Sequence, residues 1–410
     1  EILLFQNSFY GYRLVAAAFL AQFIGMGIFS YVHGPFMMPM IQELGWTRMD
    51  YSITRGLGMA VTAVCGIFIG SKIDRVGARP VMLIGGTILA LSCVLHAFVD
   101  SLVSWWLLNG VMMSVGCAMV GNLVVNVTLS KWFVVNRGMA VSIAAMGVSF
   151  GGIALTPWVT WLIDTVGWRM SWVWIGVAAA VLIYPVALAM RRMPEDYGLF
   201  PDGYSEEQVN AGAGDRALEE FSSSFSRSAA LRTFSFYALV IAFGFFTINI
   251  GVMLLHTVPY LTDNGFTSYQ AALTMAVVSL PAMISKPFWG YFIDRSPAKP
   301  LAAVSAFVTG VALFLIVYAV GQQELLWVFA AYVLLGLGWG GMIPLQEVIW
   351  ASFFGRRFLG SIRGAAMPFS LILGASAPPL VGYFHDVSGR YDEALIVVAG
   401  LNVLSGFLIF

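Results

Sequence analysis

The chain has 410 residues, of which 59% are hydrophobic and only 10% are charged, with 21 basic and 21 acidic side chains. Soluble domains have about a quarter of their residues charged, so this composition excludes an ordinary soluble protein. The balanced charge also argues against a nucleic-acid-binding protein, because such a protein needs a basic face.

Turn formers and charged clusters divide the sequence into twelve apolar stretches, each long enough for the roughly 20 residues that cross a bilayer. We therefore predict an all-α membrane protein with twelve transmembrane helices in two pseudo-symmetric six-helix halves. The predicted spans are 12–42, 48–72, 79–100, 103–132, 136–166, 168–191, 233–263, 268–292, 298–321, 325–354, 359–386 and 392–410. The predicted units are an N-terminal bundle (1–192), a polar cytoplasmic linker (193–232) and a C-terminal bundle (233–410).

The two predicted halves repeat each other at a constant offset of 220 residues. The matches fall on turn formers and charges rather than on abundant apolar residues, so composition does not explain them. They include Pro39 with Pro259, Gly45 with Gly265, Gly70 with Gly290, Asp74 with Asp294 and Arg75 with Arg295. Duplicated halves in a membrane protein predict a binding site at their seam and an alternating-access motion about it.

Lys and Arg are distributed unevenly between the two predicted membrane faces. With the amino terminus in the cytoplasm, sixteen of the 21 basic residues lie on the cytoplasmic side. Arg48, Arg169 and Arg390 lie outside, and Arg55 and Lys286 lie within spans. Because cytoplasmic loops carry the basic excess, we expect a multi-pass inner-membrane protein with a cytoplasmic amino terminus. The first span is expected to be retained as a helix, not cleaved as a signal peptide.

Motifs for catalysis or for cofactor binding are missing from the sequence. It has no phosphate-binding Gly-rich loop, no Ser-His-Asp grouping and no metal-ligand spacing. The three cysteines, Cys65, Cys93 and Cys117, all lie in apolar spans and are expected to be buried and unreactive. We therefore predict no enzymatic activity, no cofactor and no metal, and an energy source that is an ion gradient or substrate exchange. We expect a monomer.

The second helix of each half begins with a capping sequence. Thr47 precedes Asp50 by three residues, and Thr267 precedes Gln270 by the same interval. In this pattern the Thr hydroxyl accepts from the third helical amide while the other side chain reaches back to the Thr amide. The pattern predicts helix starts at both positions.

A motif of glycine and charged residues lies between the second and third helices of each half. The first copy reads Gly70-Ser-Lys-Ile-Asp74-Arg75-Val-Gly-Ala-Arg-Pro, and the second reads Gly290-Tyr-Phe-Ile-Asp294-Arg295-Ser-Pro-Ala-Lys-Pro. Both copies closely resemble the loop signature of the major facilitator superfamily, and the resemblance extends over the whole chain. It implies a transporter in which these residues control the conformational change.

Further motifs resemble the bacterial monocarboxylate-transporter and oxalate/formate-antiporter branch of that superfamily. They are Phe9-Tyr-Gly-Tyr-Arg, Trp132-Phe133-x-x-x-Arg137-Gly138, Pro194-Glu-Asp-Tyr-Gly198-x-x-Pro201-Asp-Gly203 and His256-x-x-Pro259. The resemblance implies a secondary transporter of small organic anions, and we expect proton-coupled monocarboxylate symport. Two alternatives remain open: an exchanger of organic anions, and a transporter-like sensor that binds a ligand without moving it.

Lys286 is the strongest candidate for binding the anion. An ionisable side chain in mid-membrane costs about 2.5–3.5 kcal/mol, so it usually faces a cavity or a partner. Lys286 precedes Asp294 by eight residues, which places it about 12 Å from the motif along a helix. The resemblance implies that this position, usually Arg in the family, binds the substrate carboxylate. A structural pair with Glu347 is the alternative.

Glu347, Arg363 and Arg55 are candidates for the gate or for proton coupling. Glu347 and Arg363 lie at similar depth, so they can form a salt bridge that closes the cytoplasmic side; alternatively, Glu347 carries the coupled proton. Arg55 is a candidate outer-gate residue or second anion contact, unless it extends to the outer surface.

Seven polar residues within the predicted spans are additional candidates for the substrate pocket. For each of them the alternative is a hydrogen bond that only holds helices together. They are His256, Tyr31, His33, Asn122, Asn126, Asn249 and Gln346.

Overall fold

The computed structural model describes residues 9–46, 48–210 and 221–410, and within these residues the chain is helical without strands. Helices are expected because an apolar chain in lipid must satisfy its own backbone hydrogen bonds. The N-terminal half contains α1 (Tyr10–Tyr31), α2 (His33–Leu44), α3 (Arg48–Val76), α4 (Ala78–Leu95), α5 (Leu102–Trp105), a π-helical segment (Trp106–Met113), α6 (Ser114–Val120), α7 (Asn122–Trp132) and α8 (Arg137–Ala189).

The C-terminal half contains six long helices that follow a linker with short helical turns. These helices are α12 (Phe234–Asp263), α13 (Ser268–Arg295), α14 (Ala298–Gly321), α15 (Leu325–Phe354), α16 (Leu359–Ser388) and α17 (Asp392–Ile409). The linker has 3₁₀ turns at Pro194–Tyr197 and Pro201–Gly203, α9 (Glu206–Asn210) and α11 (Arg227–Ala230).

Ten helical segments in the described part of the chain are long and apolar enough to cross a membrane. One of them, α8, supplies two crossings, because Gly167 interrupts it with a φ of 78°. A further crossing is α13, whose 28 residues are long enough to span a bilayer although Lys286 lowers their apolarity. The twelve predicted crossings are therefore all present.

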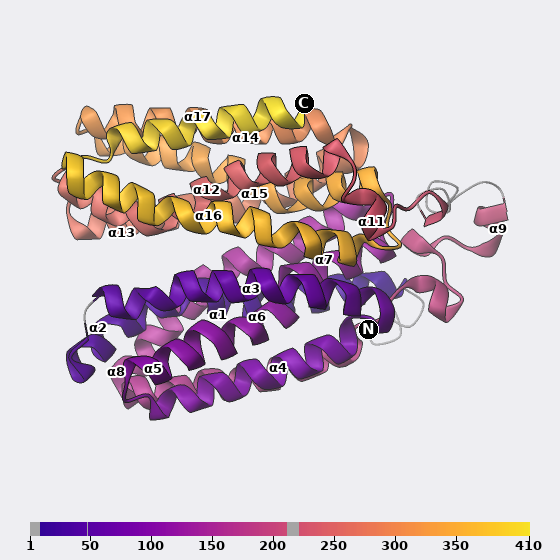
Figure 1. Ribbon diagram of the computed structural model, residues 1–410, viewed down its shortest axis with the longest axis horizontal. Helices are drawn as coiled ribbons and strands as arrows, with labels where there is room; N and C mark the ends of the chain where they lie inside the picture. The colour runs from indigo at the N-terminus through magenta and orange to yellow at the C-terminus, as the bar shows by residue number, and fades with distance from the viewer. Residues whose placement is uncertain (1–8, 47, 211–220) are drawn as a thin grey trace.

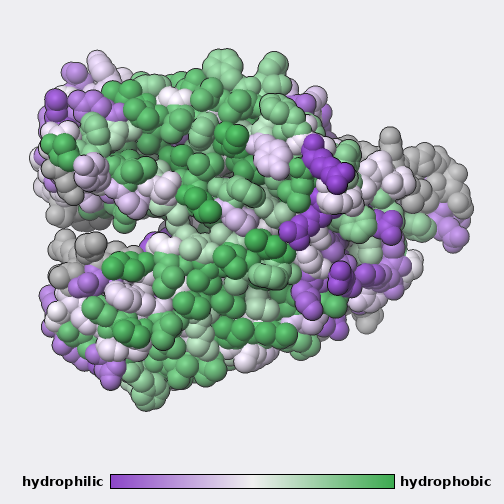
Figure 2. Space-filling model, viewed as in Figure 1, coloured by the Kyte–Doolittle hydropathy of each residue, from purple (hydrophilic) through white to green (hydrophobic). Residues whose placement is uncertain are grey.

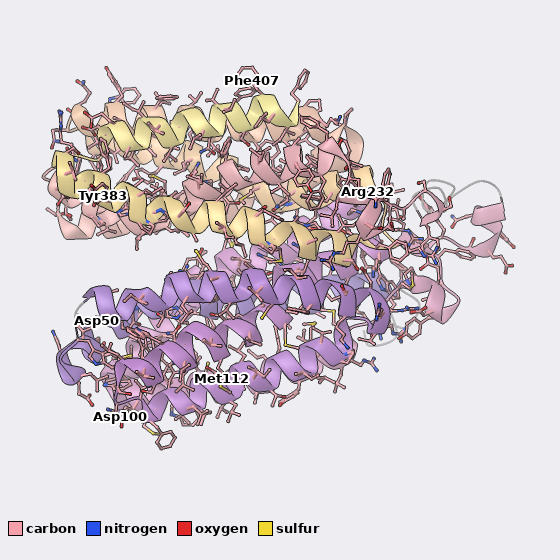
Figure 3. The ribbon with its side chains drawn as sticks, viewed as in Figure 1. Asp50, Asp100, Met112, Arg232, Tyr383 and Phe407 are labelled. Atoms are coloured by element: carbon pink, nitrogen blue, oxygen red, sulfur yellow. The ribbon has the colours of Figure 1, made fainter. Side chains whose placement is uncertain are left out.

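The two halves lie side by side and diverge toward one end (Figure 1). Helices α1–α8 form one half and α12–α17 the other, and the linker with α9 projects from the end where they meet. Apolar residues cover the middle of the molecule, while polar residues gather at its ends, and a notch separates the halves opposite the linker (Figure 2). Asp50 and Asp100 lie at the notched end and Arg232 lies toward the linker end (Figure 3).

Glycines allow the helices of the two halves to approach closely near the linker. A side chain at Gly70 of α3 would collide with the carbonyl oxygen of Gly360, at the start of α16. A Cβ at Gly290 of α13 would lie 2.8 Å from the carbonyl oxygen of Gly138 on α8. Each motif glycine therefore sits where α3 meets α16 or where α13 meets α8.

The internal repeat is retained in the structure, with one change of offset. The capping box at Thr267 is present: its hydroxyl accepts from Gln270 N at 3.2 Å, and Gln270 Oε1 accepts from Thr267 N at 2.9 Å. Thr47 lies outside the described residues. The equivalent helices α8 and α16 begin at Arg137 and Leu359, an offset of 222 (359 − 137) rather than 220. The loops that precede these helices, 133–136 and 355–358, are equally long, and α7 and α15 already end 222 residues apart, at Trp132 and Phe354. The two extra residues therefore lie earlier, after the starts of α4 and α14 at Ala78 and Ala298, which are 220 apart.

Candidate functional site

Lys286 joins the two halves at their seam. The ammonium Nζ on α13 donates to Ser149 Oγ on α8 at 2.5 Å, and the lysine is only 4% exposed. No described carboxylate forms an ion pair with Lys286; Glu347, the alternative partner, pairs with Arg363 instead. The buried ammonium is thus bonded to a neutral hydroxyl rather than to a counter-charge.

Glu347 and Arg363 form a buried ion pair within the C-terminal half. Arg363 Nη2 donates to Glu347 Oε1 at 2.5 Å, and Arg363 Nε donates to Oε2 at 3.3 Å. Asn126 Nδ2, on α7 of the other half, donates to the same Oε1 at 3.5 Å, and Gln22 Nε2 donates to Asn126 Oδ1 at 3.4 Å. A chain of four polar side chains therefore crosses the seam from α1 to α16.

Tyr31 lies at the end of α1 and also reaches the other half. Its hydroxyl lies near the Ser279 side chain of α13. Its ring packs on Gly152 of α8, where a Cβ would lie 2.8 Å from the Tyr31 ring. Tyr31, Asn126 and Lys286 thus all contribute contacts between the two halves.

Two motif aspartates hold the linker end together. Asp74 accepts from Lys131 Nζ at 2.7 Å and, across the seam, from Ser361 N at 2.7 Å and Ser361 Oγ at 2.6 Å. Asp294 accepts from Gly138 N at 2.6 Å and Met139 N at 2.9 Å. Each carboxylate therefore caps the first turn of a helix in the opposite half, where unpaired amides and the helix dipole favour a negative charge.

Arg75 and Arg295, which follow these aspartates, are exposed and do not take part in the caps. Arg295 lies over the ring of Tyr291, with its Cζ 3.7 Å from the ring centroid. Both arginines stand at the end of their helices, beside the polar surface of the linker end.

Two candidates lie instead in the notched end of the N-terminal half. Arg55 Nη1 donates to the carbonyl oxygen of Phe29 at 2.5 Å. His33 Nε2 and Asn109 Oδ1 are 2.9 Å apart. Arg55 and His33 therefore contact groups of their own half, away from Lys286.

Other candidates bind within the C-terminal half or have no side-chain partner. His256 Nε2 lies 2.8 Å from the carbonyl oxygen of Pro378, and Asn249 bonds Asn402 at 3.2 Å and Trp339 at 3.1 Å. Among described residues, Asn122 Oδ1 is buried without a hydrogen-bond partner. Gln346 is half-buried on α15.

Ser149, Ser279 and Gln22 were not among the predicted site residues, although each makes a contact at the seam. A serine in a membrane helix usually bonds a carbonyl one turn earlier, so it is a weak signal for a contact between helices. The one available signal for Ser149 is its position between Gly147 and Gly151, small residues that permit close helix approach.

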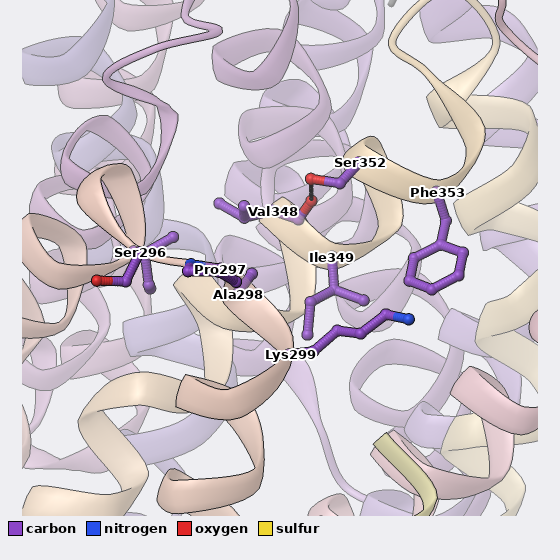
Figure 4. Close-up of a pocket in the computed structure, with 9 residues that line it drawn as sticks. Ser296, Pro297, Ala298, Lys299, Val348, Ile349, Ser352 and Phe353 are labelled. Carbon is purple, nitrogen blue, oxygen red and sulfur yellow. Dashed lines mark hydrogen bonds between the residues drawn. The ribbon is translucent and has the colours of Figure 1, made fainter. Parts of the chain in front are cut away.

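A cavity of about 390 Å³ lies elsewhere, at the linker end of the C-terminal half (Figure 4). Its walls include Lys299, Ser352 and Phe353, and it lies beyond Asp294 as seen from Lys286. It borders the seam through Ile293, which lies against Gly138 of the other half, and Lys286 is not among its lining residues. Within the described residues no group of three His, Cys, Asp or Glu side chains could hold a metal ion.

Comparison with known proteins identifies relatives along nearly the whole chain. The family model described as Major Facilitator Superfamily matches residues 15–379. Monocarboxylate transporter 11 of Mus musculus is 27% identical over 413 residues, which cover 98% of this chain and 87% of that protein. The uncharacterized MFS-type transporter YcxA of Bacillus subtilis (strain 168) is 23% identical, with 93% and 90% covered.

Solved structures share the fold at low sequence identity. The proton:xylose symporter XylE superposes with a TM-score of 0.78 at 14% identity, covering 97% of this chain and 94% of that one. The human organic anion transporter MFSD10 superposes with a TM-score of 0.76 at 14% identity, covering 98% and 99%. These similarities establish the two-half, twelve-helix architecture.

Proposed function

Because the chain belongs to the major facilitator superfamily, a family of multi-pass membrane transporters, we propose that it carries small monocarboxylate anions together with protons. Relatives named monocarboxylate transporters, which align over almost the full chain, support this substrate class. The observation that carries the proposal is Lys286, a buried cation at the seam with a hydroxyl rather than a carboxylate as its partner.

The charges at the seam favour a substrate with one negative charge. Glu347 already neutralises Arg363, and Arg55 lies in the notched end of one half, bonded to a backbone carbonyl. Lys286 is then a cation that bonds across the seam without an ion-pair partner among the described residues. A monocarboxylate balances one lysine, whereas a dicarboxylate would keep an uncompensated charge in a region of low dielectric constant.

Transport follows from alternate opening of the two ends around Lys286. The linker end is closed by the Asp74 and Asp294 caps, and we assign it to the cytoplasm of the inner membrane because basic residues gather there. The notch then faces outward. A carboxylate that enters from the notch displaces Ser149 from Lys286. Because one proton accompanies each anion, the transported pair carries no net charge, and uptake is electroneutral.

Uptake into proteoliposomes tests the proposal. Labelled aliphatic and aromatic monocarboxylates are supplied with and without an inward proton gradient, alongside dicarboxylates as competitors. We expect gradient-driven uptake of monocarboxylates that dicarboxylates inhibit weakly, and its loss in Lys286→Gln. The control is Lys299→Gln, which removes a lysine of the same half from the exposed linker end.

Two outcomes would contradict the proposal. Normal uptake in Lys286→Gln would show that Lys286 does not bind the substrate. Counterflow that ignores the pH gradient, with no net uptake into empty vesicles, would replace symport by anion exchange.

A further inference from the structure

The first part of the linker, residues 194–203, is fixed to the N-terminal half rather than extended into solvent. It consists of two 3₁₀ turns, each begun by a buried proline, Pro194 and Pro201. The Asp202 carboxylate accepts from Val134 N at 2.9 Å and Val135 N at 3.0 Å, and also from Asn136 N at 3.1 Å. These three amides directly precede α8, so Asp202 holds the segment against the loop between α7 and α8.

Glu195, in the first of these turns, contacts the other half. Its Oε1 accepts from Arg356 Nη2, and Arg356 belongs to the loop between α15 and α16. Arg356 is 1% exposed, and its Nη1 also donates to the carbonyl oxygen of Lys131, at the end of α7, at 3.0 Å. One buried guanidinium therefore links the C-terminal half both to the linker and to the N-terminal half.

The last part of the linker is attached to the same loop of the C-terminal half. Phe225 N donates to the carbonyl oxygen of Phe354 at 3.0 Å, and Arg357 N donates to Ser224 Oγ at 3.2 Å. The guanidinium of Arg357 lies 5.2 Å from the centre of the Phe221 ring. Each end of the linker is thus fixed to a different half, next to the helix ends that meet there (Figure 1).

These contacts differ in whether they survive opening of the linker end. The Asp202 bonds lie within the N-terminal half, so they persist when the halves separate. The Glu195 to Arg356 pair spans the halves, and it exists only while the ends of α7 and α15 are together. Asp202 therefore keeps Glu195 in a fixed position from which it contacts Arg356 in the closed state alone.

We propose that residues 194–203 are a latch that stabilises the state closed at the linker end, with Glu195 as the contacting group and Asp202 as its anchor. The proposal rests on the alternating-access part of the proposed function. It assigns the linker a thermodynamic role: breaking the latch shifts the resting population toward the state open at the linker end.

Distance measurements on the full chain without substrate test the latch. Spin labels are placed on cysteines introduced at the exposed Val76, at the end of α3, and Ser296, after α13, with the native cysteines replaced by serine. In Glu195→Gln we expect the ratio of open to closed molecules to rise roughly threefold or more, since an ion pair to a buried partner is lost. Asp202→Asn should act in the same direction by releasing Glu195.

Asp196→Asn is the matched control. Asp196 is the next residue in the same turn and carries the same charge, but it pairs with Arg192 of its own half, at 2.5 Å. Its loss should leave the distance distribution unchanged. Equal distributions in Glu195→Gln and Asp196→Asn would overturn the latch. Because no substrate is present, a failure of the carboxylate assignment would appear only in the uptake assay, not in these distances.

Discussion

Ser149 on one half accepts the hydrogen bond that Lys286 on the other half donates, over 2.5 Å. This bond and the binding of a substrate carboxylate compete for the same ammonium group. Ser149→Ala removes the competitor, so we expect the apparent KM for a monocarboxylate to fall roughly threefold. This change corresponds to only part of the free energy that a hydrogen bond to a charged group contributes.

The assay for Ser149→Ala is initial-rate uptake in proteoliposomes. Ser142→Ala, two turns nearer the linker on the same helix, is the control, since no described residue bonds its hydroxyl. A rise in KM for Ser149→Ala would place the hydroxyl in contact with the substrate instead.

Glu347 and Arg363 should stabilise the fold as a pair. Glu347 is 2% exposed, so Glu347→Gln leaves the Arg363 guanidinium buried without its counter-charge. Breaking a buried pair from one side costs about 3–5 kcal/mol, and thermal unfolding in detergent should show a clearly lower midpoint. Glu393→Gln breaks the exposed pair with Arg390 and should cost at most about 1 kcal/mol. Equal midpoints for the two variants would argue against a structural pair.

Gly70 should be sensitive to a single methyl group. In Gly70→Ala the new Cβ meets the carbonyl oxygen of Gly360 across the seam, so α3 and α16 cannot approach closely at the linker end. We expect slower uptake and a larger population open at that end. Gly56→Ala, on the same helix, meets nothing within 4 Å and should be neutral or stabilising by up to about 1 kcal/mol. Cysteine cross-linking across the linker end measures the closed population of each variant. Identical cross-linking yields in Gly70→Ala and Gly56→Ala would contradict this role of Gly70.

Asn249 should affect stability rather than substrate binding. It is fully buried and bonds both Asn402 and Trp339, so Asn249→Ala should lower the free energy of unfolding by about 1–3 kcal/mol and leave KM unchanged. Gln346→Ala is the comparison, because that amide makes no side-chain hydrogen bond to another described residue. A higher KM with an unchanged melting midpoint in Asn249→Ala would indicate that Asn249 binds the substrate instead.

The sequence predicted the scaffold well because its signals are local. The lengths of the apolar stretches predicted the twelve crossings. The repeated Gly70 and Gly290 coincide with the close helix contacts of the seam. The Glu347 to Arg363 pair was foreseen from similar depth alone. The offset changes from 220 at the starts of α4 and α14, Ala78 and Ala298, to 222 at the ends of α7 and α15, and matching at one constant offset does not reveal this change.

The partners of the polar residues could not be predicted in the same way. Lys286 is conspicuous in an apolar helix, but its partner Ser149 depends on how two helices 137 residues apart are rotated about their axes. The linker was predicted only as a polar segment, because acidic residues with Gly and Ser are typical of tethers without fixed contacts. Asp202 and Glu195 are ordered by amides and a guanidinium from distant loops, which composition cannot indicate.

The polarity of α13 has a consequence for how the protein is made. A lysine in mid-helix costs about 2.5–3.5 kcal/mol on insertion scales, so α13 partitions into lipid less readily than its neighbours. The helix it packs against within its half, α15, is synthesised later, so stable integration of α13 is expected to wait for α15. Nascent chains truncated after α13 and carrying a glycosylation acceptor there would show incomplete insertion of α13. Insertion should become complete in Lys286→Leu, or when the chain is extended through Phe354.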